Sequence, residues 1–216
     1  MQADFAVELG ADDPHLEVPW VSPDGRSRYY DLKQRPELLL QIAEASRNRE
    51  MGEFLTAINS PGCMLESAKC DTWLSNELNE EELIFGASWK FGSYVDLIFA
   101  DCRPRLVFTA HENFAGRICG LLKRAPEISA AAEFIIRRCY YQAEVMSTTS
   151  AAGPQEGFYF TLYLSGYGDD EDEARQRWGI GLKLAENALL QLSAKHRRGA
   201  DQTTPEATGA ATYPFA

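Results

Sequence analysis

The sequence predicts an α+β fold: a mainly antiparallel sheet with helices packed on one face, and a long C-terminal helix lying across the sheet. Segments with strand-like alternation occur in consecutive pairs between residues 64 and 164, joined by short connections rather than helical crossovers. Residues 172–197 instead place apolar side chains at helical spacing. At 216 residues, 45% of them hydrophobic, the chain is long enough to bury about 70% of its unfolded surface.

The N-terminal part predicts short extended pieces. Residues 5–9 alternate apolar and polar, as a half-buried strand does. Ser22-Pro23-Asp24-Gly25 predicts a turn, because proline presets φ and glycine tolerates a positive φ. Residues 28–32 are then expected to form the returning strand of a hairpin.

A helical region follows. Pro36 suits the first turn of a helix, and Ser60-Pro61-Gly62 predicts its end. Residues 44–50 between them are almost wholly polar. The pattern fits either one long helix with a bare central turn or two helices with a bend near Asn48.

Residues 64–110 are rich in β-branched and aromatic residues and predict strands. We expect strands over 67–74 and 84–100, with 94–99 the strongest part, and a turn at 101–105 leading into a further extended piece at 106–108. Thr109 and Glu112 match a capping box, which predicts a helix over 110–124.

The next part predicts a long hairpin. Residues 134–141 and 158–164 have strand chemistry, and the small residues at 147–155 are typical of a loop. The alanine-rich stretch 128–133 fits either a helical turn or a strand.

The C-terminal helix shows the clearest pattern. Acidic residues fill 169–173 and basic ones 195–198, so each helix end carries the charge that the helix dipole favours. The apolar stripe consists of Ala174, Trp178, Leu182, Ala185, Leu189 and Leu192. Gly199 predicts the end of this helix, so we expect a single domain over 1–198 and a flexible tail over 199–216.

A helix followed by two strands occurs twice in this predicted order. Residues 91–97 and 157–163 also resemble each other in the placement of aromatic residues. Shared strand composition or a true repeat would both explain this similarity.

Charge and composition exclude several classes of function. The formal net charge of −11 argues against binding to nucleic acid or to anionic membranes, and no apolar run approaches a membrane span. The N-terminus lacks the pattern of a signal peptide, and the five cysteines are scattered without a CxxC pair. We therefore expect a soluble, cytoplasmic protein with reduced thiols.

No cofactor or metal is expected. The acidic run 169–173 lacks the spacing of a calcium-binding loop, and the glycines at 179 and 181 follow no strand, as a dinucleotide-binding turn would. The two glycines do weaken a helix, so another backbone or a ligand is expected to come close beside Trp178.

The strand aromatics and His111 are the candidate functional residues. Tyrosine and tryptophan suit amphipathic surfaces, so we expect Trp178, Tyr94, Tyr141, Tyr159 and His111 to bind a ligand or partner. The favoured function is a non-catalytic module that binds a small apolar ligand or a protein partner, with a homodimer as one such partner. The alternative is an enzyme whose pocket uses His111 with strand Tyr or Asp residues for acid–base chemistry. The sequence does not decide whether the chain is an enzyme.

Overall fold

The computed structural model describes residues 1–146 and 153–202, which form one mixed, mostly antiparallel sheet with helices. The long strands lie in the order β1-β5-β6-β4-β3, and the short β2 pairs with β5 beyond β1. Neighbours among β3, β4, β6 and β5 are antiparallel, whereas β1 and β2 run parallel to β5. The strands are β1 (Gln2–Glu8), β2 (Leu16–Val18), β3 (Leu65–Ser75), β4 (Trp89–Phe99), β5 (Ala130–Tyr141) and β6 (Gln155–Gly168). The α+β class predicted from the sequence is confirmed.

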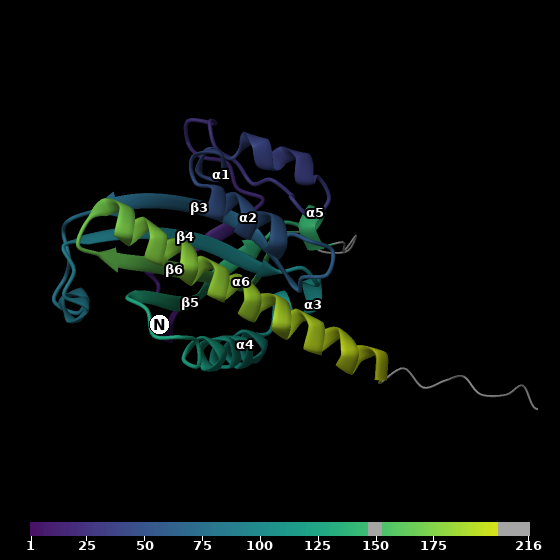
Figure 1. Ribbon diagram of the computed structural model, residues 1–216. Helices are drawn as coiled ribbons and strands as arrows, with labels where there is room; N and C mark the ends of the chain where they lie inside the picture. Colours follow the sequence, from purple (N-terminus) through teal and green to yellow (C-terminus); the bar gives the residue numbers. More distant parts are fainter. Residues whose placement is uncertain (147–152, 203–216) are drawn as a thin grey trace, which may run out of the picture.

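Three helices cover one face of this sheet. They are α2 (Arg49–Ile58), α4 (Phe108–Leu122) and α6 (Glu171–Gln202), and α6 lies lengthwise over β6 and β4, as Figure 1 shows. Shorter elements connect the strands: η1 (Pro36–Gln41), α1 (Ala43–Arg47), η2 (Glu82–Phe85), α3 (Cys102–Arg105) and α5 (Ala143–Met146). None of the described helices is both long and apolar enough to cross a membrane.

The main core lies between the sheet and these three helices. Phe54 and Ile58 of α2, Phe114 and Ile118 of α4, and the predicted stripe of α6 meet the strands there, and all are buried. The strands contribute every second residue, among them Phe91, Val95, Phe134, Phe160 and Leu162.

Helix α6 reaches the sheet at two strand glycines. A Cβ atom on Gly166 would lie 2.1 Å from the backbone nitrogen of Trp178, and one on Gly168 would lie 2.4 Å from that of Ala174. No side chain fits at either position, so the helix backbone rests directly on β6. The close approach beside Trp178 expected from the sequence therefore exists. Gly166 and Gly168 of β6 permit it, however, rather than the glycines of α6 from which it was predicted. Within α6, Gly181 packs against Leu164 and Gly179 lies beside Glu50.

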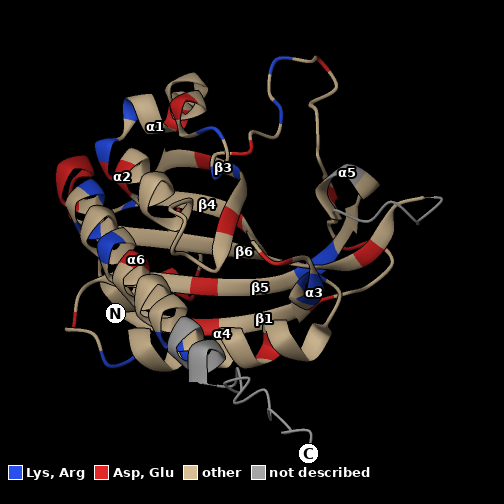
Figure 2. Cartoon of the chain, turned by 90° about the vertical axis from the view of Figure 1, so that its right-hand side faces the viewer, with Lys and Arg blue, Asp and Glu red and all other residues tan. Residues whose placement is uncertain are grey.

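The first turn of α6 carries Glu171, Asp172 and Glu173, visible as the red end of the helix in Figure 2. The Asp170 carboxylate accepts from the backbone N–H of Glu173, which satisfies a free donor of that turn. The helix does not end at Gly199 but continues to Gln202, because a glycine in a helix costs only about 1 kcal/mol and does not force a stop. The rest of the expected tail, 203–216, lies outside the described residues, as does most of the expected loop at 147–155.

The helical region after Pro36 resolves into η1, α1 and α2, with a break at Asn48. The Asn48 side chain is buried; it donates to Thr72 of β3 and accepts from Arg175 of α6. These bonds fix the bend, so the two-helix alternative is confirmed. Residues 130–133 are part of β5, paired with β1 and β6, which decides the other open alternative in favour of a strand.

The expected hairpin around Gly25 is wrong beyond the turn itself. Only an isolated bridge joins Val21 to Arg28, and residues 29–32 form no strand. The backbone N–H of Tyr29 still donates to the carbonyl of Trp20, but its hydroxyl donates to Glu66 of β3, and the pairing goes no further.

The extended piece expected at 106–108 is also wrong. The side chain of Arg105 is drawn into the protein by Glu66 and by the carbonyl of Phe99, so the chain folds into α3 and then enters α4 at Phe108. This earlier start puts Thr109 inside the helix, and no side chain caps its N-terminus.

The repeated element order is present as α2-β3-β4 and α4-β5-β6, with β4 and β6 side by side. The similarity between 91–97 and 157–163 does not preserve the two faces, however. It aligns Tyr94, which lies outside the main core, with Phe160, which lies inside it. Aromatic composition therefore explains this similarity better than an equivalence of positions.

The contact between α6 and β6 predicts that Gly166→Ala destabilises the protein. Its methyl group would overlap the backbone of Trp178 and Ala174, and we expect a loss of about 3 kcal/mol in the free energy of unfolding, measured by denaturant titration. Gly116→Ala in α4 is the matched control, because nothing lies within 4 Å of its new methyl group and alanine favours helix. A Gly166→Ala protein as stable as the control would contradict the direct contact.

Candidate functional site

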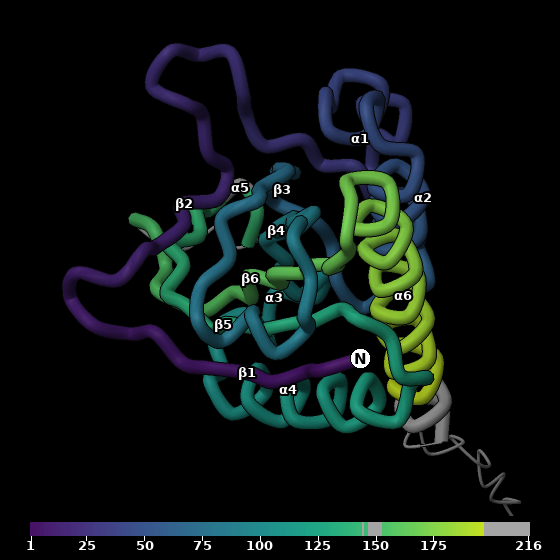
Figure 3. The backbone as a smooth tube through the Cα atoms, turned by 60° about the vertical axis from the view of Figure 1, so that its left-hand side comes forward, coloured from purple at the N-terminus to yellow at the C-terminus, as the bar shows by residue number. Residues whose placement is uncertain are grey.

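The sheet face opposite α2, α4 and α6 is the candidate site, and we call it the distal face. Figure 3 shows α2 and α6 on one side of the strands and the segment between β1 and η1 on the other. The register places the distal side chains in rows that cross the whole sheet. From β3 to β1, three successive rows are Trp73-Gly92-Ser165-Ala131-Gln2, Asp71-Tyr94-Tyr163-Glu133-Asp4 and Lys69-Asp96-Thr161-Ile135-Ala6.

One end of the distal face is covered by a second apolar cluster. It joins β2 and α5 to the sheet and contains Leu16, Val18, Ala68, Ile98, Cys139, Tyr141, Met146 and Tyr159. Trp20 packs at its margin, with its indole N–H donating to the carbonyl of Ala68. A buried ion pair, Arg105–Glu66 at 2.9 Å, lies beside this cluster. The cluster leaves the rest of the distal face to polar and aromatic side chains.

A hydrogen-bonded chain crosses the middle of the distal face. Asp96 accepts from the Thr161 hydroxyl at 2.7 Å, and Thr161 accepts from Arg137 at 3.0 Å. Arg137 also pairs with Glu8 at 2.7 Å and approaches the Tyr163 hydroxyl at 3.4 Å. Four strands are therefore tied together through side chains as well as through the backbone.

Asp96 is the most perturbed carboxyl of this chain of bonds. It is only 5% exposed. Burial raises its pKa from 3.8 to about 6, while the Thr161 bond and the charges of Lys69 and Arg137 oppose the rise. Buried carboxyls of this kind occur both in catalytic sites and in structural networks.

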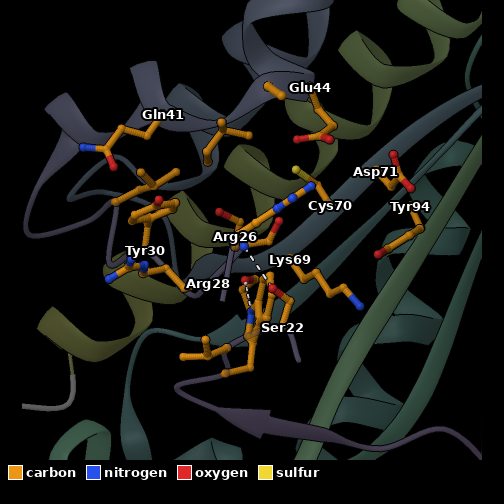
Figure 4. A pocket seen from close by; sticks show the side chains of 18 of the residues that line it. Ser22, Arg26, Arg28, Tyr30, Gln41, Glu44, Lys69, Cys70, Asp71 and Tyr94 are labelled. Atoms are coloured by element: carbon orange, nitrogen blue, oxygen red, sulfur yellow. Dashed lines mark hydrogen bonds between the residues drawn. The ribbon is translucent and has the colours of Figure 1, made fainter. Parts of the chain in front are cut away.

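A hollow of about 620 Å³ opens at the edge strand β3, between the segment 20–30 and helix α1. Figure 4 shows its residues, which come from four parts of the chain: residues 20–32, 41–44 and 67–71, and Tyr94 of β4. The Lys69 ammonium lies 5.5 Å from the ring centre of Trp20 and 5.8 Å from that of Tyr94. Burial raises the pKa of the neighbouring Cys70 thiol to about 12, so that thiol is protonated and a poor nucleophile at neutral pH.

A second hollow, of about 700 Å³, lies over the row of Trp73, Ser165 and Ala131, and we call it the aromatic hollow. The small side chains of this row form its floor, and larger ones wall it on both sides. Tyr163, Glu133 and Asp4 form one wall, and Tyr167, Lys90, Glu82 and Phe85 form the other. The indole of Trp73 lies over Gly92, where a Cβ atom would come within 2.6 Å of it. Glycine at 92 therefore sets the position of the tryptophan.

The structure separates the five residues expected to bind. Tyr94 lies half-buried on the distal face beside the edge hollow. Tyr141 and Tyr159 are on the same side but buried in the second cluster. Trp178 and His111 are on the other side of the sheet, in the main core, and both are 0% exposed. The indole of Trp178 donates to Ser93 at 2.8 Å, which gives its polar atom a partner inside the core.

His111 is enclosed by phenylalanine rings. Phe99, Phe158 and Phe160 lie within 5.6 Å of its ring centre, and its Nδ1 atom lies 3.0 Å from the Val107 carbonyl. Burial lowers its pKa from 6.5 to about 4, although the bond to Val107 opposes the shift. The imidazole is therefore neutral at physiological pH, and the sheet separates it from the strand carboxyl Asp96.

Five residues of the distal face were not among those predicted to bind. Trp73 and Tyr163 were counted only among the strand aromatics, and Asp96, Arg137 and Glu133 were not predicted individually. Alternation along each strand is the signal that puts them on one face. Their proximity depends on the strand order, which brings β1 and β5 beside β6 and β4. Nothing in the local sequence of β1 reveals its partner.

All five cysteines are free, and Cys63, Cys119 and Cys139 are buried. Across residues 1–146 and 153–202, no three His, Cys, Asp or Glu side chains come together as a metal site would require. Comparison with known proteins finds no matching family, no matching curated protein and no matching solved structure.

The raised pKa of Asp96 predicts a pH-dependent effect of Asp96→Asn. Between about pH 4 and pH 6 the folded chain keeps a proton that the unfolded chain has lost, so the carboxyl disfavours folding increasingly as the pH rises. From about pH 4 to pH 7 the free energy of unfolding of the wild type should fall by about 3 kcal/mol relative to the variant. Denaturant titrations across this range measure the difference, and a constant difference would refute the assignment.

The lowered pKa of His111 predicts the opposite slope. Below about pH 6.5 the unfolded chain takes up a proton that the folded chain excludes, so the wild type loses stability as the pH falls towards 4. His111→Phe, which suits the surrounding rings, removes this loss, so the free energy of unfolding of the wild type should fall by about 3 kcal/mol relative to the variant from pH 7 to pH 4. An imidazole that titrates near 6.5 by NMR in the folded protein would be incompatible with this burial.

Proposed function

We propose that this chain is a non-catalytic binding module that holds its ligand on the distal face of the sheet. The observation that carries the proposal is a face lined with tryptophan and tyrosine side chains and hollowed over a row of small residues. Tyrosine, tryptophan and arginine are enriched where proteins bind partners. Hollows of several hundred cubic ångströms suit small molecules or single side chains.

The lining favours a partly polar ligand over a wholly apolar one. The aromatic hollow combines Trp73, Tyr163 and Tyr167 with the charged groups of Asp4 and Glu133. An apolar ligand would leave these charged groups without water or partners, which costs free energy. The small apolar ligand expected from the sequence is therefore refined to a ligand with an aromatic or flat part and a polar group.

The geometry favours binding over acid–base catalysis. The two groups with perturbed pKa that the enzyme alternative would combine are His111 and Asp96, and they lie on opposite faces of the sheet. Asp96 is itself enclosed and already bonded to Thr161. Its raised pKa is accounted for by burial within a network that ties strands together.

Self-association stays a prediction. The segment between β1 and η1 rises from the distal face in Figure 3. Two distal faces that stacked on each other would have to accommodate this segment. This shape favours a ligand or a projecting segment as the occupant of the face.

The test is a chemical-shift map with ¹⁵N-labelled protein and small aromatic fragments that carry positive, negative or no charge. We expect the largest shifts at amides of Gly92, Tyr163 and Ser165. Trp73→Ala should weaken binding about fivefold or more, because it removes one aromatic wall. Trp89→Ala removes a half-buried tryptophan of the same strand pair on the α6 side and serves as the matched control.

Shifts confined to the α6 side, or equal effects of the two variants, would refute the proposal. Spectra at low and high protein concentration separate ligand binding from self-association, since only the latter shifts resonances without any fragment.

A further inference from the structure

A like-charge pair lies in the wall of the aromatic hollow. Asp4 of β1 and Glu133 of β5 are direct partners in the parallel register, and both are exposed on the distal face. Like charges directly opposite each other destabilise a sheet. The pKa of Glu133 is raised by partial burial and by the negative charges of Glu8 and Asp4, which shows the same repulsion.

Two of the cationic groups near this pair, Lys90 and Arg137, are engaged elsewhere, and the Lys123 side chain also lines the hollow. Lys90 bonds to both carboxylate oxygens of Glu82, at 2.8 and 3.0 Å. Arg137 is held by Glu8 and Thr161 in the neighbouring rows. The hollow as a whole is lined by four carboxylates and two ammonium groups, so its field is negative.

Aromatic rings form the rest of the lining of the hollow. Tyr167 stacks on Phe85 with 4.1 Å between ring centres and 8° between planes, and its hydroxyl donates to Glu82. Trp73 lies over Gly92, and Tyr163 stands between Tyr94 and Glu133 in its row. These rings are fixed by packing before any ligand arrives. Ordering them therefore costs little free energy when a ligand binds.

We propose that the aromatic hollow binds an organic cation, an ammonium or guanidinium group on a flat or apolar body, with Asp4 and Glu133 facing the charge and Trp73, Tyr163 and Tyr167 facing the body. This deepens the proposed function and rests on it. A bound cation relieves the repulsion between the two carboxylates, and aromatic faces attract cations through their quadrupoles.

The size and lining of the hollow favour an organic cation over a metal ion. A space of about 700 Å³ exceeds what one ion fills, and no three potential metal ligands converge among the described residues. A free amine and a lysine or arginine side chain of a partner share the required chemistry.

The experiment compares three probes of nearly equal shape by NMR titration of the full chain: phenethylammonium, neutral 2-phenylethanol and anionic phenylacetate. We expect phenethylammonium to bind most tightly and to shift the amides of Ala131, Glu133 and Ser165. Asp4→Asn with Glu133→Gln should weaken its binding about tenfold, since both negative charges of the wall are removed. Binding of 2-phenylethanol should change little.

The matched control is Glu112→Gln with Asp172→Asn, two exposed acids on α4 and α6, which alters net charge equally. Unfolding curves check that both double variants fold; the wall variant should be the more stable of the two, since it relieves repulsion. N-acetyl-lysine methylamide is the side-chain probe. Tighter binding of this probe than of phenethylammonium points to a protein partner, and the reverse to a free amine.

Equal loss of phenethylammonium binding in the wall and control variants would overturn the assignment of the charge to Asp4 and Glu133. Preferential binding of 2-phenylethanol or phenylacetate in the hollow would overturn the proposal that the ligand is a cation, but would leave the proposed function intact. No shift on the distal face with any probe would overturn both.

Discussion

The direct contact between helix α6 and strand β6 organises the rest of the molecule. Because Gly166 and Gly168 have no side chains, the helix backbone at Ala174 and Trp178 rests on the strand. The apolar stripe of α6 then fills one face of the sheet, together with α2 and α4. The alternate residues of the same strands point away from all three helices, so the distal face follows from this packing.

Beyond the apolar cluster of β2 and α5, the distal face is held by polar interactions rather than by a second helical layer. Asp96, Thr161, Arg137 and Glu8 link β4, β6, β5 and β1 through short contacts between side chains. Buried ionic networks contribute little net stability compared with apolar packing, but breaking one partner is costly. This arrangement suits a surface whose side chains must stay in fixed positions.

The size of the residues in each row of the distal face decides where a ligand would fit. Gly92, Ser165 and Ala131 leave space between rows that carry tyrosines, and Trp73 closes the space at the edge strand. Asp4 and Glu133 give that space its charge. A repulsive pair in the wall of a preformed hollow is a cost to the free protein that a cationic ligand would remove.

Periodicity by itself determined the class of the fold, the long C-terminal helix and the hairpin of β5 and β6, because these features depend on residues near one another in the chain. The bend at Asn48 and the strand at 130–133 stayed open, since each is decided by partners far away in sequence, such as Thr72 and Arg175 for the bend and β1 for the strand. Capping preferences were misleading at two positions. At Thr109, the buried ion pair of Arg105 leads to a helix that begins at Phe108, before the expected cap. At Gly199, α6 continues to Gln202 instead of ending.

For the candidate site, too, the sequence determined which residues share a face, and only the tertiary structure decided which of them are accessible. Alternation alone indicates that Tyr94 and Tyr159 share a face, but only tertiary structure shows Tyr159 covered by β2 and α5 while Tyr94 stays at the surface. The sequence led us to expect Trp178 and His111 at a binding surface, because a helical stripe looks alike whether it packs on a sheet or on a partner. The structure places both side chains in the main core. The pairing of Asp4 with Glu133 joins residues 129 positions apart, and the free energy of the whole sheet, not any local preference, brings those two charges together.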